Sequence, residues 1–168
     1  PALPELNTKV RSWLDAKQRD PYPPRVRLVT FEASNAKAFW LRVDKFAPTV
    51  FDPDRRLSIK APLGMEYSPE QIHAIYVSEM NKKMGQVVAA VSPGNRINIT
   101  TRHIEELTVF LDDRLVDLDK PVRIIANGEV AFSGKVERSL EQLFESARFH
   151  RDPRLCYAAA VRIKVRDK

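Results

Sequence analysis

The stretch LDDRLVDLDKPVRIIANGEVAFSG, residues 111–134, decides the fold of this 168-residue chain. Its second half has an apolar run on each side of Asn127-Gly128. This dipeptide is a strong signal for a β-hairpin, because a type I′ turn needs a positive φ at both central residues. Pro121 suits the entry into the first strand, since proline is tolerated where a strand begins. The stretch therefore predicts antiparallel β-structure.

The first half of the same stretch allows a second interpretation, because it is rich in carboxylates. Its aspartates are Asp112, Asp113, Asp117 and Asp119. A calcium loop alternates oxygen ligands around a glycine, but this segment lacks that glycine and offers Arg114 and Lys120 as salt partners. Aspartate is also a common turn former after a strand. We favour a structural corner over a metal or catalytic site, and the role of the aspartates stays open.

Alternation of apolar and polar residues with a period of two continues the β-pattern along the chain. The further strand candidates are RVRLVTF (25–31), AKAFWLRV (36–43), LSIKAP (57–62), QVVAAV (86–91), RINITT (96–101), LTVFLD (107–112) and CYAAAVRIKV (156–165). In the second of these, we expect Phe39 and Leu41 on one face and Trp40 on the other. Consecutive strands without helices between them favour antiparallel pairing and a mainly β sandwich with two or three helical additions.

Residues 1–20 carry Leu6, Val10, Trp13 and Leu14 at helical spacing, and the prolines of 21–24 predict a stiff linker. The domain expected after it spans 25–168. The apolar stripe of the first helix is made either for a preceding domain or for this chain's own sheet. The first residues do not have the pattern of a signal peptide. Because the chain opens without Met, we expect a processed or excised piece of a longer protein.

Two further segments show helical spacing. Residues 68–84 combine Ser68, Pro69 and Gln71 in a capping box, with Gly85 placed as a terminator. The β-rich IHAIYV within this segment keeps a strand alternative open. The stretch SLEQLFESARFH (139–150) is the other helix candidate.

Composition limits the classes of function. The chain is 43% hydrophobic and 30% charged, and no segment approaches the ~20 apolar residues of a membrane span. Cys156 is the only cysteine, which excludes an intrachain disulfide and leaves the redox compartment open. The net charge of +6 suits a polyanion partner. In VRIKVRDK, the alternating Arg162, Lys164 and Arg166 indicate a cationic strand face, either merely solvated or binding a polyanion.

Motifs for catalysis or cofactors are missing from the sequence. His73, His103 and His150 lack the spacing of a metal site, and there is no G-x-S-x-G elbow, dinucleotide fingerprint or Walker loop. We expect no catalytic, metal or cofactor site. A small stand-alone enzyme would need His103 or His150 to meet Asp112, Asp117 or Asp119. Trp40, Tyr67 and Tyr157 are possible ligand contacts for a sugar if exposed on one face, and core residues otherwise.

Four segments in this order resemble a known protein family. They are DPYPPRVRLVTF (20–31), AFWLRVD (38–44), residues 95–145 from NRINITT to SLEQLFE, and DPRLCYAAAVRIKV (152–165). Together they are similar to the C-terminal region that follows the α/β-hydrolase domain in secreted bacterial esterases and peptidases of the planctomycete type. The segment 116–134 is the most specific part, whereas 47–84 is longer and more helical than the family pattern.

The resemblance implies an antiparallel Ig-like β-sandwich that is non-catalytic, with residues 1–20 as the end of the preceding hydrolase domain. It implies an extracytoplasmic or secreted location and a parent chain that is a serine hydrolase. The expected function is an accessory domain that supports packing of the enzyme or access of its substrate. The alternative is a carbohydrate- or polyanion-binding module, with polysaccharide as partner and nucleic acid not expected, and the third hypothesis is the stand-alone enzyme.

Overall fold

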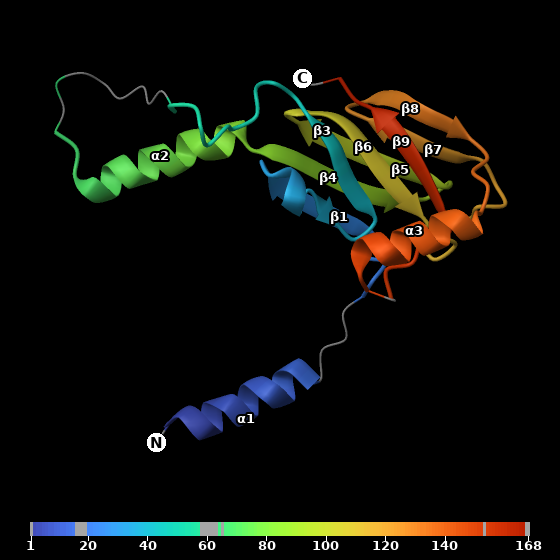
Figure 1. Ribbon diagram of the computed structural model, residues 1–168, viewed down its shortest axis with the longest axis horizontal. Coiled ribbons are helices and arrows are strands. Elements are labelled where there is room, and N and C mark those ends of the chain that lie inside the picture. Colours follow the sequence, from blue (N-terminus) through green and yellow to red (C-terminus); the bar gives the residue numbers. More distant parts are fainter. Residues whose placement is uncertain (1, 16–19, 58–63, 65, 153, 167–168) are drawn as a thin grey trace.

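The computed structural model describes residues 2–15, 20–57, 64, 66–152 and 154–166. For residues 2–6 only the backbone is described. In these ranges two sheets face each other and helices are added at their ends (Figure 1). The strands are β1 (Arg25–Thr30), β2 (Lys37–Ala38), β3 (Leu41–Phe46), β4 (Gly85–Ser92), β5 (Arg96–Arg102), β6 (Ile104–Leu111), β7 (Val122–Ala126), β8 (Glu129–Gly134) and β9 (Ala159–Lys164). The helices are α1 (Ala2–Asp15), the short 3-10 helix η1 (Ala33–Asn35), α2 (Pro69–Lys83) and α3 (Leu140–His150). The predicted mainly β sandwich with helical additions is confirmed.

The five-stranded sheet has the order β1-β4-β5-β7-β8, and the four-stranded sheet has the order β2-β3-β6-β9. All pairs are antiparallel except β5 and β7, which run parallel. The exception arises because the chain changes sheets at His103, whose φ of 56° turns β5 into β6. After β6 has run through the other sheet, β7 returns beside β5 in the same direction.

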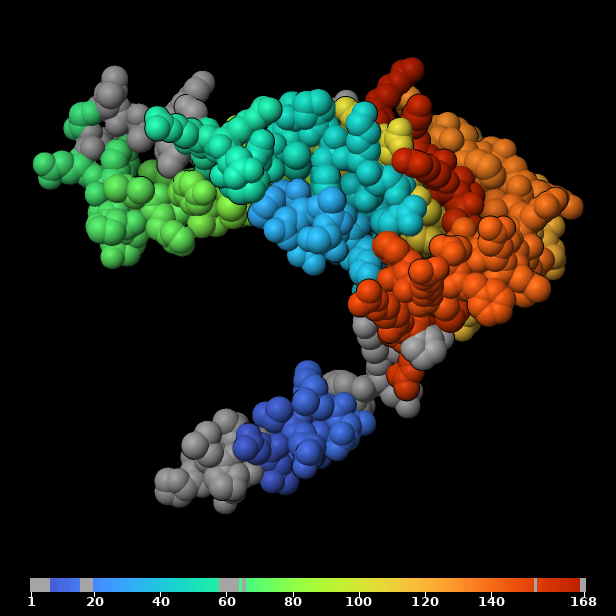
Figure 2. Space-filling view, viewed as in Figure 1, coloured from blue at the N-terminus to red at the C-terminus, as the bar shows by residue number. Residues whose placement is uncertain are grey.

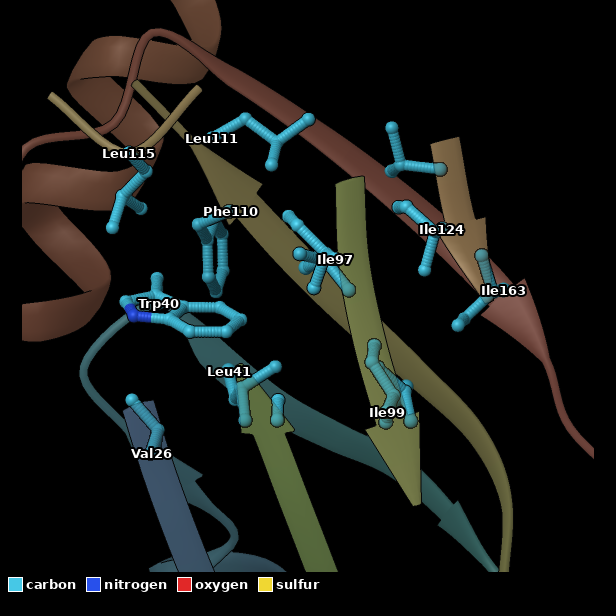
Figure 3. Packing of buried hydrophobic residues seen from close by; sticks show 14 of the residues in the cluster. Val26, Trp40, Leu41, Ile97, Ile99, Phe110, Leu111, Leu115, Ile124 and Ile163 are labelled. Atoms are coloured by element: carbon cyan, nitrogen blue, oxygen red, sulfur yellow. The ribbon is translucent and has the colours of Figure 1, made fainter. Parts of the chain in front are cut away.

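The core lies between the two sheets and takes the inward side chain of every second residue. Figure 3 shows side chains from β1, β3, β5, β6, β7 and β9 meeting in this layer. Trp40 is fully buried there, and its indole Nε1 donates to the Pro23 carbonyl at 2.8 Å. The single strand expected over 36–43 is wrong, because Phe39 has a φ of 49° and turns the chain between β2 and β3.

The hairpin that the sequence predicted around Asn127-Gly128 is confirmed. It joins β7 to β8, with φ of 52° at Asn127 and 89° at Gly128. The Asn127 side chain also ties the turn to its surroundings. Its Oδ1 accepts from the Thr101 N–H at 2.8 Å, and its Nδ2 donates to the Arg166 carbonyl at 2.8 Å. This residue therefore links the hairpin to β5 and to the end of the chain.

The helix predicted over residues 68–84 is confirmed as α2, and the strand alternative is wrong. Ser68 Oγ accepts from the Gln71 N–H, and Gln71 Oε1 accepts from the Ser68 N–H, which completes the capping box. Gly85 is not the terminator that we expected but the first residue of β4. A Cβ there would lie 2.7 Å from Phe46 Cε1 and 2.8 Å from the Thr30 carbonyl oxygen. Close packing, rather than a left-handed turn, therefore requires glycine.

Helix α1 lies apart from the sandwich, as Figure 2 shows for the dark blue segment. Its apolar side chains Val10, Trp13 and Leu14 are 48%, 61% and 56% exposed. The alternative in which this stripe packs on the chain's own sheet is therefore wrong, and a preceding domain as its partner stays a prediction. Residues 58–62, most of the LSIKAP candidate, lie outside the described residues. None of the helices in the described ranges has the length and apolar character needed to cross a membrane.

Candidate functional site

The three aromatic residues considered for ligand contact do not form an exposed row. Trp40 and Tyr157 are both 0% exposed, so neither ring can meet a ligand at the surface. Tyr157 packs edge-on against Tyr22, with ring centroids 5.5 Å apart. Tyr67 is half-buried in the segment before α2. The expectation of a sugar-binding row with Trp40 and Tyr157 is therefore wrong, because both rings belong to the core.

The histidines lie in separate places. His103 Nε2 lies 2.8 Å from the Lys82 carbonyl oxygen and its Nδ1 lies 2.8 Å from Thr49 Oγ1. Since a carbonyl only accepts, Nε2 carries the proton and donates. His150 packs among Phe110, Phe149 and Tyr157, and burial lowers its pKa to about 4. These contacts give both histidines structural partners.

The aspartates form the polar corner that the sequence favoured. Asp112 pairs with Arg114 at 2.6 Å and Asp117 pairs with Lys120 at 2.6 Å, so the two expected salt partners are confirmed. Arg138 bridges Asp113 and Asp119, with both distances at 2.7 Å. This guanidinium lowers the pKa of Asp113 below its usual value. The carboxylates are thus paired with cations rather than turned toward a histidine.

Arginines with no ion-pair partner among the described residues collect elsewhere, on the outer face of the five-stranded sheet. Because side chains alternate along a strand, each strand turns one set of residues away from the core. The residues of this arginine face are Arg25 and Arg27 on β1, Arg96 and Arg102 on β5, and Arg123 on β7. The pairing register brings them onto one surface, with Arg96 directly opposite Arg123. Except for Arg102, which is half-buried, these side chains are exposed.

The outward positions of β1, β4, β5 and β7 carry no carboxylate. Between the arginines lie neutral residues, namely Val29, Gln86, Val88, Ala90, Ser92, Asn98, Thr100 and Ile125. The outer face of the four-stranded sheet differs, because its arginines are neutralised. There Arg42 pairs with Asp44 at 2.6 Å, and Arg162 pairs with Glu106 at 2.7 Å. Among the described residues, the arginines of this face have no carboxylate partner, so the face is a cationic surface open to an external anion.

Helix α2 forms a wall at one end of this face, although no residue of the helix is fully buried. Three consecutive carbonyls of its last turn are held by the body of the protein. The Asn81 oxygen accepts from Arg102 Nη2 at 2.9 Å, the Lys82 oxygen from His103, and the Lys83 oxygen from the Phe51 N–H at 2.8 Å. Carbonyls in the last turn of a helix lack their usual partner four residues on, so these bonds fix the direction in which α2 leaves the sheet.

A groove of about 610 Å³ lies between α2 and the sheet, and we name it the α2 groove. Its lining is His73, Ala74, Val77, Ser78, Asn81 and Lys82 from α2, with Gln86 from β4 and Arg102 from β5. Lys82 also pairs with Glu79 at 2.5 Å, which leaves Arg102 as the groove's main cation. Gln86 and Arg102 are cross-strand partners, so the groove opens onto the arginine face.

The sequence-based reasoning looked for the cationic face in the last strand and missed the arginine face. Arg162 of that strand belongs to the four-stranded sheet and is paired with Glu106. The signal that was available is the alternation in RVRLVT, RINITTR and VRI, which puts each arginine on the polar side of its strand.

A scan against protein-family models, a search of curated proteins and a search of solved structures each give no match.

Proposed function

We propose that this domain is a non-catalytic binding module that holds an anionic polysaccharide on its arginine face. One observation carries the proposal: five arginines share the outer face of one sheet, and four neighbouring strands of that sheet turn no carboxylate outward. The planar guanidinium presents several N–H donors that match a carboxylate or sulfate in two parallel hydrogen bonds. A surface of this kind favours a ligand with many acidic groups over a single small anion.

The size of the face also suits a polymer. Strands lie about 4.8 Å apart and rise about 3.4 Å per residue. Arg96 and Arg102 are therefore separated by about 20 Å along β5, and β1 lies about 14 Å from β7 across the sheet. A ligand must be extended to reach arginines at both ends. Binding would then add several weak, salt-sensitive contacts along one chain.

The neutral residues of the face favour polysaccharide over nucleic acid. Proteins that bind single-stranded nucleic acid stack its bases on aromatic side chains, and the outward positions of β1, β4, β5 and β7 carry none. They carry amides and hydroxyls instead, among them Asn98, Thr100 and Ser92, which can bind sugar hydroxyls. We therefore commit to a polysaccharide and make nucleic acid an outcome of the test.

We propose as a second role that the module is the accessory domain of an exported serine hydrolase. The exposed apolar side chains Val10, Trp13 and Leu14 of α1 support this, because an isolated helix of 14 residues gains little stability without packing. Such a helix fits a neighbouring domain of the parent chain. A polymer-binding face would then keep the enzyme near its substrate outside the cytoplasm.

The first proposal is tested by binding to polygalacturonate, with its fully methyl-esterified form as the uncharged control. The variant Arg27→Gln/Arg96→Gln/Arg123→Gln removes three charges from the face. The matched control Arg56→Gln/Arg148→Gln/Lys164→Gln removes three exposed charges elsewhere. We expect at least a tenfold loss of affinity in the first variant and less than a twofold change in the second. The proposal is rejected if the two variants lose affinity for polygalacturonate to the same extent. It is also rejected if the wild type binds double-stranded DNA more tightly than polygalacturonate.

A further inference from the structure

We infer that the α2 groove is the subsite for one uronic acid unit at the end of the polymer segment on the arginine face. This inference rests on the proposed function and adds a place where the ligand is recognised by placed apolar and polar groups as well as by charge. A pyranose unit of this kind has an apolar C–H surface, a rim of hydroxyls and one carboxylate. The α2 groove offers a matching group for each of these three features.

The apolar part of the groove comes from Ala74 and Val77 on α2. They are small, so they leave space for a sugar ring between the helix and the sheet. The polar part comes from Ser78 and Asn81 on α2 and from Gln86 on β4. A hydroxyl and two amides can donate and accept, as the hydroxyls of a sugar do. Binding sites for small ligands combine apolar walls with a few placed polar groups in this way.

Arg102 supplies the charge for the carboxylate. Its Nη2 donates to the Asn81 carbonyl oxygen at 2.9 Å, which holds the guanidinium against the wall of the groove. Its Nε is buried and has no hydrogen-bond partner among the described residues. Because the Nε is enclosed, the donors open to a ligand are those of the two Nη groups that the Asn81 carbonyl does not take, and the position of the guanidinium is already fixed. Fixing a binding group before the ligand arrives lowers the entropy lost on binding.

The groove is continuous with the rest of the arginine face. Val29, Gln86 and Arg102 form one row across β1, β4 and β5. The next outward row, two residues along, contains Arg27, Val88 and Thr100. Two residues along a strand correspond to about 7 Å, so a chain lying over Arg27 can reach the groove with its next unit. The hydrogen bonds that anchor the end of α2 keep this wall in place.

The test compares a short and a long ligand in the full chain by titration calorimetry. Trigalacturonate is the short ligand, and polygalacturonate of many units is the long ligand. The groove variants are Gln86→Ala and Ser78→Ala, and Tyr76→Ala is the control on α2 outside the groove. We expect the groove variants to weaken trigalacturonate binding at least fivefold, while long polygalacturonate keeps most of its affinity and salt dependence. The control should change either affinity by less than twofold.

Arg102→Lys keeps the charge but loses the planar fork, and we expect it to weaken trigalacturonate binding to a similar extent. Because Arg102 also holds α2, the Gln86 and Ser78 variants decide the test if this variant unfolds. If both bind trigalacturonate as the wild type does, or if methyl-esterified trigalacturonate binds equally well, the groove inference is wrong. In that outcome the arginine face is still judged by long polygalacturonate, so failure of the subsite and failure of the proposed function are distinguishable.

Discussion

Arg96 and Arg123 lie directly opposite each other on the parallel strands β5 and β7, and both side chains are exposed. Like charges at facing positions of a sheet destabilise it. The pair therefore costs stability, and the proposed ligand, with an anion that would bind both guanidinium groups, would account for its presence. Arginines of the four-stranded sheet, such as Arg42, avoid this cost because each has a carboxylate partner.

We expect Arg123→Thr to stabilise the free protein while it weakens polygalacturonate binding. The change removes the repulsion and introduces a β-branched residue that suits a strand, so the free energy of unfolding should rise by about 0.5 kcal/mol. Urea denaturation at low salt measures this rise, and added salt should shrink it. A loss of stability, or unchanged binding, would show that the facing arginines have another role.

Gly85→Ala should destabilise the protein by more than about 2 kcal/mol, because an added Cβ overpacks a closed site. That atom would lie 2.7 Å from Phe46 Cε1 and 2.8 Å from the Thr30 carbonyl oxygen, and the backbone oxygen cannot move aside. Gly134→Ala is the matched control, since its nearest atom would be Phe132 Cζ at 3.6 Å. Thermal unfolding of both variants measures the difference, and equal melting temperatures would contradict it.

Asn127→Ala should cost about 2–3 kcal/mol. The variant loses three side-chain hydrogen bonds, two of them to Thr101 and one to the Arg166 carbonyl. It also puts alanine at a φ of 52°, which asparagine tolerates better. Asn98→Ala, which loses one exposed bond to Ser92, is the control and should cost much less. Denaturation curves that coincide for the two variants would exclude the anchoring role of Asn127.

His150 should make the protein less stable in acid. Burial first, and then the nearby Lys37 and Arg42, lower its pKa from 6.5 to about 4. Between these values the unfolded chain binds a proton that the folded chain does not, so stability falls as pH drops from 6.5 to about 4 and levels off below. Because the ring is partly exposed, we expect a loss of about 2 kcal/mol.

The measurement is urea denaturation of the wild type, His150→Phe and the exposed control His73→Phe at pH 7 and pH 4.5. Carboxylates such as Asp113 contribute equally in all three proteins, so they cancel in the comparison. His150→Phe should lose less stability in acid than the other two. The same loss in all three proteins would show that His150 does not carry this pH dependence.

The local parts of this structure could be predicted from the sequence, because they depend on neighbouring residues. The turn at Asn127-Gly128 and the cap at Ser68 follow from backbone preferences that act within four residues. The burial of Trp40 could not be predicted in this way, since it depends on a turn at Phe39, a residue type that rarely adopts a positive φ.

The candidate site depends on information that one sequence does not contain. Arg27 and Arg123 are far apart in the chain, and only the strand order β1-β4-β5-β7 places them on one surface. The same order decides which arginines find carboxylates: Arg162 meets Glu106 because β9 pairs with β6. Alternation predicts that each of these side chains points outward, but topology decides whether a partner lies beside it.

The central claim is that the outer face of the five-stranded sheet binds the polymer, and an NMR titration with an oligogalacturonate long enough to span β1 to β7 tests it most directly. We expect the backbone amide signals of Arg27, Asn98 and Arg123 to shift as the ligand is added. The signals of Thr108 and Lys164, on the four-stranded sheet, should stay in place. Shifts confined to the four-stranded sheet or to α3, or no shifts at all, would contradict the account.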